Sequence, residues 1–173
     1  PRILFEADAM PDLVVSAEIC EDVWSPVPPS IDAAREGATV IVNCSASDET
    51  IGKAAYRKSL IEGQSARLLA AYIYANAGEG ESTTDLVFGG HNIISENGTT
   101  LAEGERFQNG VIYAQVDVKR LISERRKNTT FKTARDRRLP RVPFHVELTR
   151  TRLSRKFPSR PFVPDAKEER DRR

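Results

Sequence analysis

Three short apolar segments alternate with two helix-forming segments, and this alternation restricts the possible folds of the chain more than any other feature. The apolar segments, residues 13–20, 38–43 and 71–76, are rich in β-branched or aromatic side chains and have the length of strands. Between them, residues 31–36 are bounded by a capping serine and a glycine, and residues 53–70 are rich in helix formers. Strands that alternate with helices bury their apolar faces in layers. We therefore predict a layered α/β fold.

The pattern changes after residue 81, where short strand-like segments follow one another through tight turns. Strands are predicted at residues 85–88, 92–95, 99–102 and 110–118. Asn97-Gly98, between the second and third of these, is a strong signal for a β-hairpin. A short basic helix is predicted over residues 118–126. A meander of this kind after alternating strands and helices fits the same α/β class.

Charge divides the chain into two parts. Residues 1–123 carry 9 Lys and Arg against 18 Asp and Glu, a net charge of −9, whereas residues 124–173 carry 17 against 7, a net charge of +10. We predict a folded body over residues 1–123 and a basic, Pro-containing linker or arm over residues 124–173. A basic arm can bind nucleic acid or an acidic partner. The simplest interpretation is an arm that lies on its own acidic body or on an acidic neighbour.

Composition restricts the class of protein. Apolar residues make up 39% of the chain and charged residues 29%, as in soluble globular proteins. No apolar run has the length of a membrane-spanning helix, and no secretory signal is visible. Cys20 and Cys44 are too few for a disulfide framework, which favours a reducing, cytoplasmic setting. Because the chain starts at Pro1, we expect a piece of a longer protein or a processed product.

Cys20 is the main candidate for chemistry. It ends an apolar strand, and reactive groups in open α/β sheets lie beyond the carboxyl ends of strands. A nucleophilic thiol must be activated as a thiolate, and Glu21 and Asp22 would oppose this if they faced the sulfur. Taken on composition alone, Cys20 is better interpreted as a small buried apolar residue, and we predict a buried structural thiol for Cys44 as well.

A family resemblance changes the interpretation of Cys20. Residues 18–24 (EICEDVW), followed by residues 26–30 (PVPPS), resemble the nucleophile segment of the nitrilase, or carbon-nitrogen hydrolase, superfamily, and within it the glutaminase domains of glutamine-dependent NAD synthetases. Further matches in order are residues 37–40, Asn43, Ser45, Ser47 and residues 51–52, 65–67, 72–85, 96–98, 101–103, 105–107 and 161–164. The resemblance covers most of residues 2–123. It implies part of an α-β-β-α sandwich of which the N-terminal half is missing.

The resemblance also implies a mechanism. Members of this family use a Glu–Lys–Cys triad, in which the thiol attacks the amide carbon of glutamine, ammonia leaves and water hydrolyses the thioester. Cys20 takes the position of the nucleophile. The Glu and the Lys come from segments upstream of the cysteine in this family, and no lysine precedes Cys20 here. We therefore expect this chain alone to be inactive as a glutaminase.

Substrate contacts are also implied by the resemblance. Ser47 matches a position that binds glutamine, and Lys53 stands where an arginine that clamps the substrate carboxylate is expected. Lysine keeps the charge but loses the two-pronged geometry of arginine. Glu21 and Trp24 are expected to line the pocket, Trp24 as an apolar wall. Without the resemblance, Ser47 is an ordinary loop serine, Lys53 an exposed helical lysine and Trp24 a core aromatic residue.

Cofactors and partners follow from the same resemblance. We expect no cofactor in this chain, and ATP and magnesium in the synthetase domain of the full-length enzyme. His91 and His145 have no zinc-ligand spacing, so no metal is expected. The expected partners are L-glutamine, the synthetase domain of the same polypeptide and further copies of the protein in a homo-oligomer, with no membrane or nucleic acid.

Two other hypotheses for the function stay open at this point. The first is another amidase of the nitrilase superfamily. The second is a non-catalytic interaction module whose basic tail binds a partner or a nucleic acid, and such binding would weaken steeply as salt is added.

Overall fold

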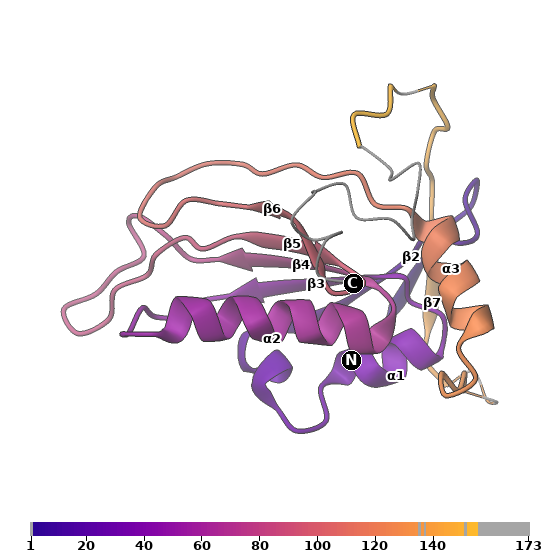
Figure 1. The fold of residues 1–173 in the computed structure, drawn as a ribbon, viewed down its shortest axis with the longest axis horizontal. Coiled ribbons are helices and arrows are strands. Elements are labelled where there is room, and N and C mark those ends of the chain that lie inside the picture. The colour runs from indigo at the N-terminus through magenta and orange to yellow at the C-terminus, as the bar shows by residue number, and fades with distance from the viewer. Residues whose placement is uncertain (1, 135, 137, 151, 156–173) are drawn as a thin grey trace, which may run out of the picture.

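The computed structural model describes residues 2–134, 136, 138–150 and 152–155, and a mixed sheet forms the centre of this part of the chain (Figure 1). Its strands are β1 (Leu4–Ala7), β2 (Val14–Ile19), β3 (Val40–Ser45), β4 (Ala71–Asn76), β5 (Ile93–Glu96), β6 (Thr99–Glu103) and β7 (Arg141–Phe144). The helices are the 3₁₀ helix η1 (Cys20–Trp24) and the α-helices α1 (Pro29–Arg35), α2 (Lys53–Leu68) and α3 (Val118–Lys127). The family-like residues 161–164 lie outside the described residues.

The strands run in the order β6-β5-β4-β3-β2-β1-β7. β2, β3 and β4 are parallel, whereas β1 and β5 flank them in antiparallel orientation. Parallel neighbours need a crossover connection, and α1 and α2 provide the two crossovers. This arrangement confirms the predicted α/β class and the predicted strands over residues 13–20, 38–43 and 71–76.

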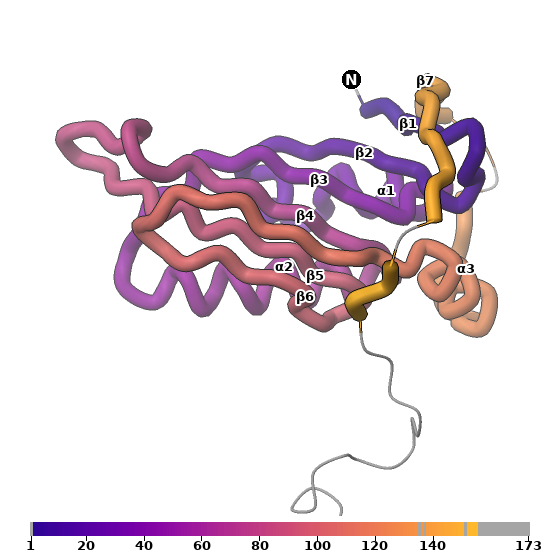
Figure 2. Tube along the Cα trace, turned by 90° about the horizontal axis from the view of Figure 1, so that it is seen from above, coloured from indigo at the N-terminus to yellow at the C-terminus, as the bar shows by residue number. Residues whose placement is uncertain are grey.

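α1 and α2 cover one face of the sheet (Figures 1 and 2). Ile41 and Tyr72 from the sheet share a buried cluster with Ala34 of α1 and Ile61 of α2. Full burial of a side chain such as Ile61 contributes roughly 1.5–3 kcal/mol, so this cluster is a major source of stability. No helix among the described residues is both long and apolar enough to cross a membrane.

α3 packs against the opposite face of the sheet. Its residues Val118 and Leu121 are buried with Val40 and Ala71, which alternate along their strands with the residues that face α2. Residues 105–117 cross the same face before α3 begins (Figures 1 and 2). Both faces of the sheet therefore carry apolar clusters, but helices α1 and α2 cover only one of them.

Near the carboxyl ends of the parallel strands, this second face is open. Cys44 pairs in register with Ile19 on one side and Ala75 on the other, and all three side chains are exposed. The neighbouring Asn43 points to the opposite face and is buried. The prediction of a buried thiol for Cys44 is therefore wrong, because the alternation of the strand turns that side chain to the open face.

A buried arginine joins the ends of two helices. Arg125 of α3 donates hydrogen bonds of 2.6–3.4 Å to backbone carbonyls at or just after the carboxyl ends of α1 and α2, those of Ala34, Ala38, Leu68 and Leu69. The ring of Phe131 lies 4.9 Å from its guanidinium carbon. Burial lowers the pKa of Arg125 to about 10, so the side chain stays charged at neutral pH. Its charge also complements the negative ends of both helix dipoles.

The described part of the basic tail lies on the acidic body. β7 pairs in parallel with β1, with Pro143 opposite Glu6, and Arg141 forms an ion pair with Glu6. Arg155 forms an ion pair with the buried Glu96 over 2.6 Å. α3 runs across residues 123 and 124, so the predicted change from body to arm falls inside a helix.

Several predicted elements differ in the structure. The hairpin at residues 97–98 and the helix over residues 118–126 are confirmed as the β5–β6 turn and α3. Residues 85–88 form only an isolated bridge, and the strand predicted over residues 110–118 is absent, because no neighbouring strand pairs with either segment. β1 and β7 were not predicted from the sequence, since each is short and lies towards one edge of the sheet.

Candidate active site

Three polar residues gather at the carboxyl ends of the parallel strands. Cys20 follows β2 directly, Ser47 lies two residues beyond β3, and Asn76 ends β4. Because these strands are neighbours and run in the same direction, their carboxyl ends meet at one edge of the sheet. Ligands and reactive groups of α/β proteins collect at such an edge. This edge is therefore the candidate site.

The chain bends sharply at Cys20. The residue has a φ of 49°, in the left-handed region that non-glycine residues rarely adopt. The turn of η1 that follows is closed by Asp22, whose carboxylate accepts the backbone N–H of Ile19 over 2.8 Å. Cys20 is half-buried, whereas Glu21 is exposed. A strained bend that exposes a nucleophile at the end of a strand is a recurrent arrangement in hydrolytic enzymes.

The side-chain amide of Asn43 holds this bend from the neighbouring strand. Its Oδ1 accepts the backbone N–H of Cys20 over 3.1 Å, and its Nδ2 donates to the Cys20 carbonyl over 3.3 Å. Asn43 is almost completely buried, so its own side of these bonds is shielded from water. A buried amide whose bonds are satisfied in this way fixes the geometry around it.

Ser47 is held in place by two side chains. Its backbone N–H donates to Asn76 Oδ1 over 2.8 Å, and its carbonyl accepts from Asn76 Nδ2 over 3.0 Å. Its hydroxyl accepts from Arg57 Nη2 over 3.3 Å. Ser47 is buried, so the loop that carries it has a defined conformation at the site.

Arg57 is fully buried at the centre of a polar network. It donates to Glu49 over 2.6 Å and to Nδ1 of His91 over 3.0 Å. Because arginine only donates, His91 Nδ1 must accept, and the proton on its Nε2 points to Glu103 2.9 Å away. Lys58 and then His91 hold the pKa of Glu103 below its ordinary value. The network ties the Ser47 loop to the β5–β6 hairpin.

Lys53 and Trp24 lie next to each other. The Lys53 ammonium is 6.0 Å from the ring centroid of Trp24, and Trp24 also stacks at a tilt on Tyr56 with centroids 5.4 Å apart. Asp48 forms an ion pair with Lys53, and its hydrogen bond from Lys53 lowers the pKa of Asp48. The predicted carboxylate clamp therefore already has an anionic neighbour within the chain.

Reasoning from the sequence missed the supporting residues of this site. The polar residues Glu18, Asn43, Tyr72, Asn76 and Arg57 hold the site, and no role was predicted for them. Glu18, Asn43 and Tyr72 interrupt otherwise apolar strands on the face that meets α2, where a polar side chain needs a partner. That pattern, a polar residue at a buried strand position, is the signal that would have found them.

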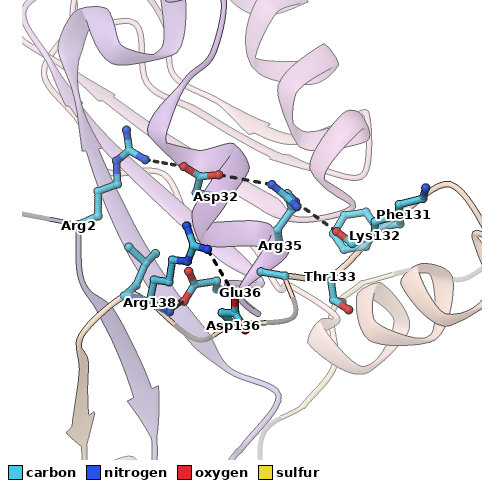
Figure 3. A pocket seen from close by; sticks show the side chains of 11 residues that line it. Arg2, Asp32, Arg35, Glu36, Phe131, Lys132, Thr133, Asp136 and Arg138 are labelled. Atoms are coloured by element: carbon cyan, nitrogen blue, oxygen red, sulfur yellow. Dashed lines mark hydrogen bonds and ion pairs between the residues drawn. The ribbon is translucent and has the colours of Figure 1, made fainter.

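A separate cavity of about 740 Å³ lies between α1 and the segment after α3. Figure 3 shows ion pairs in its lining, of Arg2 and Arg35 with Asp32 and of Arg138 with Asp136. Its lining includes none of the predicted site residues. Within the described part of the chain, no group of three or more His, Cys, Asp or Glu side chains could hold a metal ion.

Comparisons with known proteins identify the family of the chain. The family model for carbon-nitrogen hydrolases matches residues 2–126. The chain is 53% identical over 131 residues to a protein of Mycobacterium tuberculosis (strain H37Rv) named glutamine-dependent NAD(+) synthetase, a match that covers 75% of this chain and 19% of that protein. It is 47% identical over 174 residues to the protein of the same name from Mycobacterium leprae, covering 95% of this chain and 26% of that protein.

A solved structure adds information on the fold. A nitrilase-superfamily protein from Saccharomyces cerevisiae matches with a TM-score of 0.59 and 21% identity, over 71% of this chain and 44% of that one. The predicted nitrilase-type fold is thereby confirmed. The chain spans between 19% and 26% of the length of the two curated relatives.

Proposed function

Because the chain belongs to the carbon-nitrogen hydrolase family, we propose that it carries the cysteine nucleophile of a glutamine-hydrolysing NAD synthetase. The main support is Cys20, which stands at a strained bend where the parallel strands end, with its backbone held by Asn43. The names of the mycobacterial relatives support the choice of glutamine and NAD among the reactions of this family.

In the proposed reaction, the Cys20 thiolate attacks the side-chain amide carbon of L-glutamine. The C–N bond breaks, the leaving group takes a proton and departs as ammonia, and a thioester remains on Cys20. Water then hydrolyses the thioester to glutamate and restores the thiol. A glutamate is the general base and a lysine stabilises the oxyanion and protonates the leaving group, as the family resemblance implies. The ammonia serves the ATP-dependent conversion of deamido-NAD to NAD.

The substrate's amino-acid end is assigned to the loop after β3 and to the start of α2. Lys53 binds the α-carboxylate of glutamine, and Ser47 contacts its α-amino or α-carboxylate group. Trp24, close to Lys53, forms the apolar wall of the pocket, and Glu21 lines its outer side. The close approach of Lys53 to Trp24 supports this assignment, because both residues are expected to line the same pocket.

The partners are proposed at the level of the whole enzyme. They are a synthetase domain of the same polypeptide, which binds ATP and magnesium, and further copies of the protein in a cytoplasmic homo-oligomer. A nucleic-acid-binding role for the basic tail has less support, because Arg141 and Arg155 are already paired with carboxylates of the body.

The test is ammonia release from L-glutamine by the complete natural polypeptide. Replacing the nucleophile, Cys20→Ala, is expected to lower the rate by about 1,000-fold or more. Cys44→Ala is the matched control, because this second thiol lies on the open face of the sheet, and the rate should stay within about twofold. Full activity of Cys20→Ala would exclude Cys20 as the nucleophile.

The 173-residue chain alone supplies a second test. It is expected to release no ammonia from glutamine, because no lysine precedes Cys20 to complete the triad. Ammonia release that depends on Cys20 in this chain would show that another base and another cation serve the thiol.

A further inference from the structure

The backbone of Cys20 lies beyond the last paired residues of β2 and β3. The last pair in register between β2 and β3 joins Ile19 and Cys44. A residue in the left-handed region costs about 1–2 kcal/mol if it is not glycine, so Cys20 needs other contacts to keep its conformation. The two bonds from Asn43 provide them, because they engage both the N–H and the carbonyl of Cys20.

Tyr72 fixes the orientation of the Asn43 amide. Asn43 Nδ2 donates to the Tyr72 hydroxyl over 3.1 Å, and this hydroxyl donates to Glu18 Oε1 over 2.5 Å. A carboxylate only accepts, so the one hydrogen of the hydroxyl must point to Glu18, and its oxygen must accept from Asn43. The Asn43 oxygen is then left to face the N–H of Cys20.

The chain of bonds is shielded from water. Glu18, Asn43 and Tyr72 are each at most 2% exposed, and the second oxygen of Glu18 accepts the backbone N–H of Ser30 over 2.8 Å. Burial, and next the charge of Glu18, raise the pKa of Tyr72, so the hydroxyl keeps its proton. The direction of every bond in the chain is therefore set by the carboxylate at its end.

We propose that Glu18, Tyr72 and Asn43 form a positioning relay that sets the backbone conformation of Cys20 and thereby aims its thiol at the substrate amide. The relay is a line of hydrogen bonds, and none of its three side chains touches the reacting atoms. Its effect on turnover rests on the proposed glutaminase function, whereas its effect on the Cys20 backbone does not.

Replacing Glu18 by glutamine should exchange the donor and acceptor in each hydrogen bond of the relay. The Gln oxygen would accept from Ser30, so its NH₂ group would point to Tyr72. The hydroxyl of Tyr72 would then accept from Gln and donate to Asn43. The Asn43 amide must turn over, and its NH₂ group would face the N–H of Cys20, which loses its acceptor.

The experiment uses the complete natural polypeptide in four forms, wild type, Glu18→Gln, Tyr72→Phe and the double variant. Tyr74→Phe is the matched control, because the Tyr74 hydroxyl is buried on the same strand without a hydrogen-bond partner among the described residues. For each form, kcat and KM for glutamine are measured. The ¹³Cα chemical shift of Cys20 reports its backbone conformation, with Cys44 as the internal reference.

Glu18→Gln and Tyr72→Phe are each expected to move the Cys20 resonance and to lower kcat about tenfold or more, with KM within about twofold. In the Tyr72→Phe background, Glu18→Gln should have no further effect on kcat, because the line to Asn43 is already broken. Tyr74→Phe should change neither readout.

Three results would overturn the relay: an unmoved Cys20 resonance in both single variants, effects on kcat that add in the double variant, or an equal effect of Tyr74→Phe. A wild-type protein without glutaminase activity would instead refute the proposed function, and the Cys20 resonance would still decide whether the relay exists.

Discussion

The ammonium group of Lys53 has two neighbours of different character, the carboxylate of Asp48 and the ring of Trp24. The Asp48 carboxylate competes with any anionic ligand for the Lys53 ammonium group. The face of the Trp24 ring attracts the same ammonium group and helps to hold it in place. The side chains of Lys53 and Asp48 are 24% and 33% exposed, so a ligand can reach the pair from solvent. At the scale of single residues, the proposed carboxylate clamp is thus held in position before the substrate arrives.

Replacing the charge of this clamp should weaken substrate binding without changing the chemistry. Lys53→Gln is expected to raise KM for glutamine about tenfold, because a hydrogen bond to a charged group is lost, while kcat stays within about twofold. Lys53→Arg, the matched control, should keep KM near or below that of the wild type, because it adds a two-pronged donor. Steady-state kinetics with glutamine test both variants. A loss of kcat in Lys53→Gln with unchanged KM would contradict the assignment.

At the scale of elements, α3 is the component that joins the two crossover helices. The guanidinium of Arg125 reaches carbonyls at or just after the ends of both α1 and α2, where the hydrogen bonds within each helix end. One side chain therefore satisfies two helix ends and fixes their spacing at the end of the sheet where α3 lies.

Removing that guanidinium should destabilise the whole fold. Arg125→Met keeps an apolar side chain of similar length but removes the donor to the carbonyls of Ala38, Leu68 and Leu69, and the free energy of unfolding should fall by about 3 kcal/mol. Arg126→Met, on the exposed side of the same helix, should change it by less than about 0.5 kcal/mol. Urea denaturation compares the two, and equal effects would contradict the role of Arg125.

The contact between α2 and β6 should depend on pH. Lys58 and then His91 lower the pKa of Glu103 in the folded state, so its contribution to stability is complete above the unfolded value of about 4.5 and is lost as pH falls through the folded value. Urea denaturation of wild type and Glu103→Gln should therefore give a difference in unfolding free energy near neutral pH that shrinks in acid. A difference that stays constant in acid would show that charge is not its source.

The interior strands were predicted from the sequence because their apolar runs reflect burial on both faces, as in β3 and β4. β7 was missed because its sequence, RVPF, carries no strand pattern, and only pairing with β1 makes it a strand. Cys20 was found through a family resemblance. The relay behind it was not, because the contact of Asn43 with Tyr72 depends on strand order and register, which a single sequence does not contain.

At the scale of the whole molecule, an ion pair attaches the last described segment, residues 152–155, to the central sheet. Glu96 of β5 is 3% exposed and receives both Arg155 and the backbone N–H of Asp117. The hydrogen bond that Arg155 donates to Glu96 raises the pKa of Arg155, because the carboxylate stabilises the charged guanidinium. The segment that contains Arg155 is thereby attached to the sheet at a specific point.

Loss of that attachment should expose the tail to proteases. Glu96→Gln is expected to speed tryptic cleavage after Arg152 and Arg155, because Arg155 loses the carboxylate that attaches it to β5. Glu124→Gln, which removes the exposed partner of Lys127, is the control and should leave cleavage after Arg152 and Arg155 unchanged. Mass spectrometry of timed digests measures the rates. Equal rates in wild type and Glu96→Gln would mean that the ion pair does not hold the segment.

The edge strand β7 also affects how the molecule associates with other copies of itself. The carbonyl of Phe144 accepts the N–H of Asp8, so Phe144 faces β1 and its neighbour Pro143 faces outward. Proline has no backbone N–H, so a strand of another molecule that paired with β7 would lack one hydrogen-bond donor at Pro143. Proteins block runaway edge-to-edge aggregation by this means, so β7 acts as a stop to sheet growth on that side.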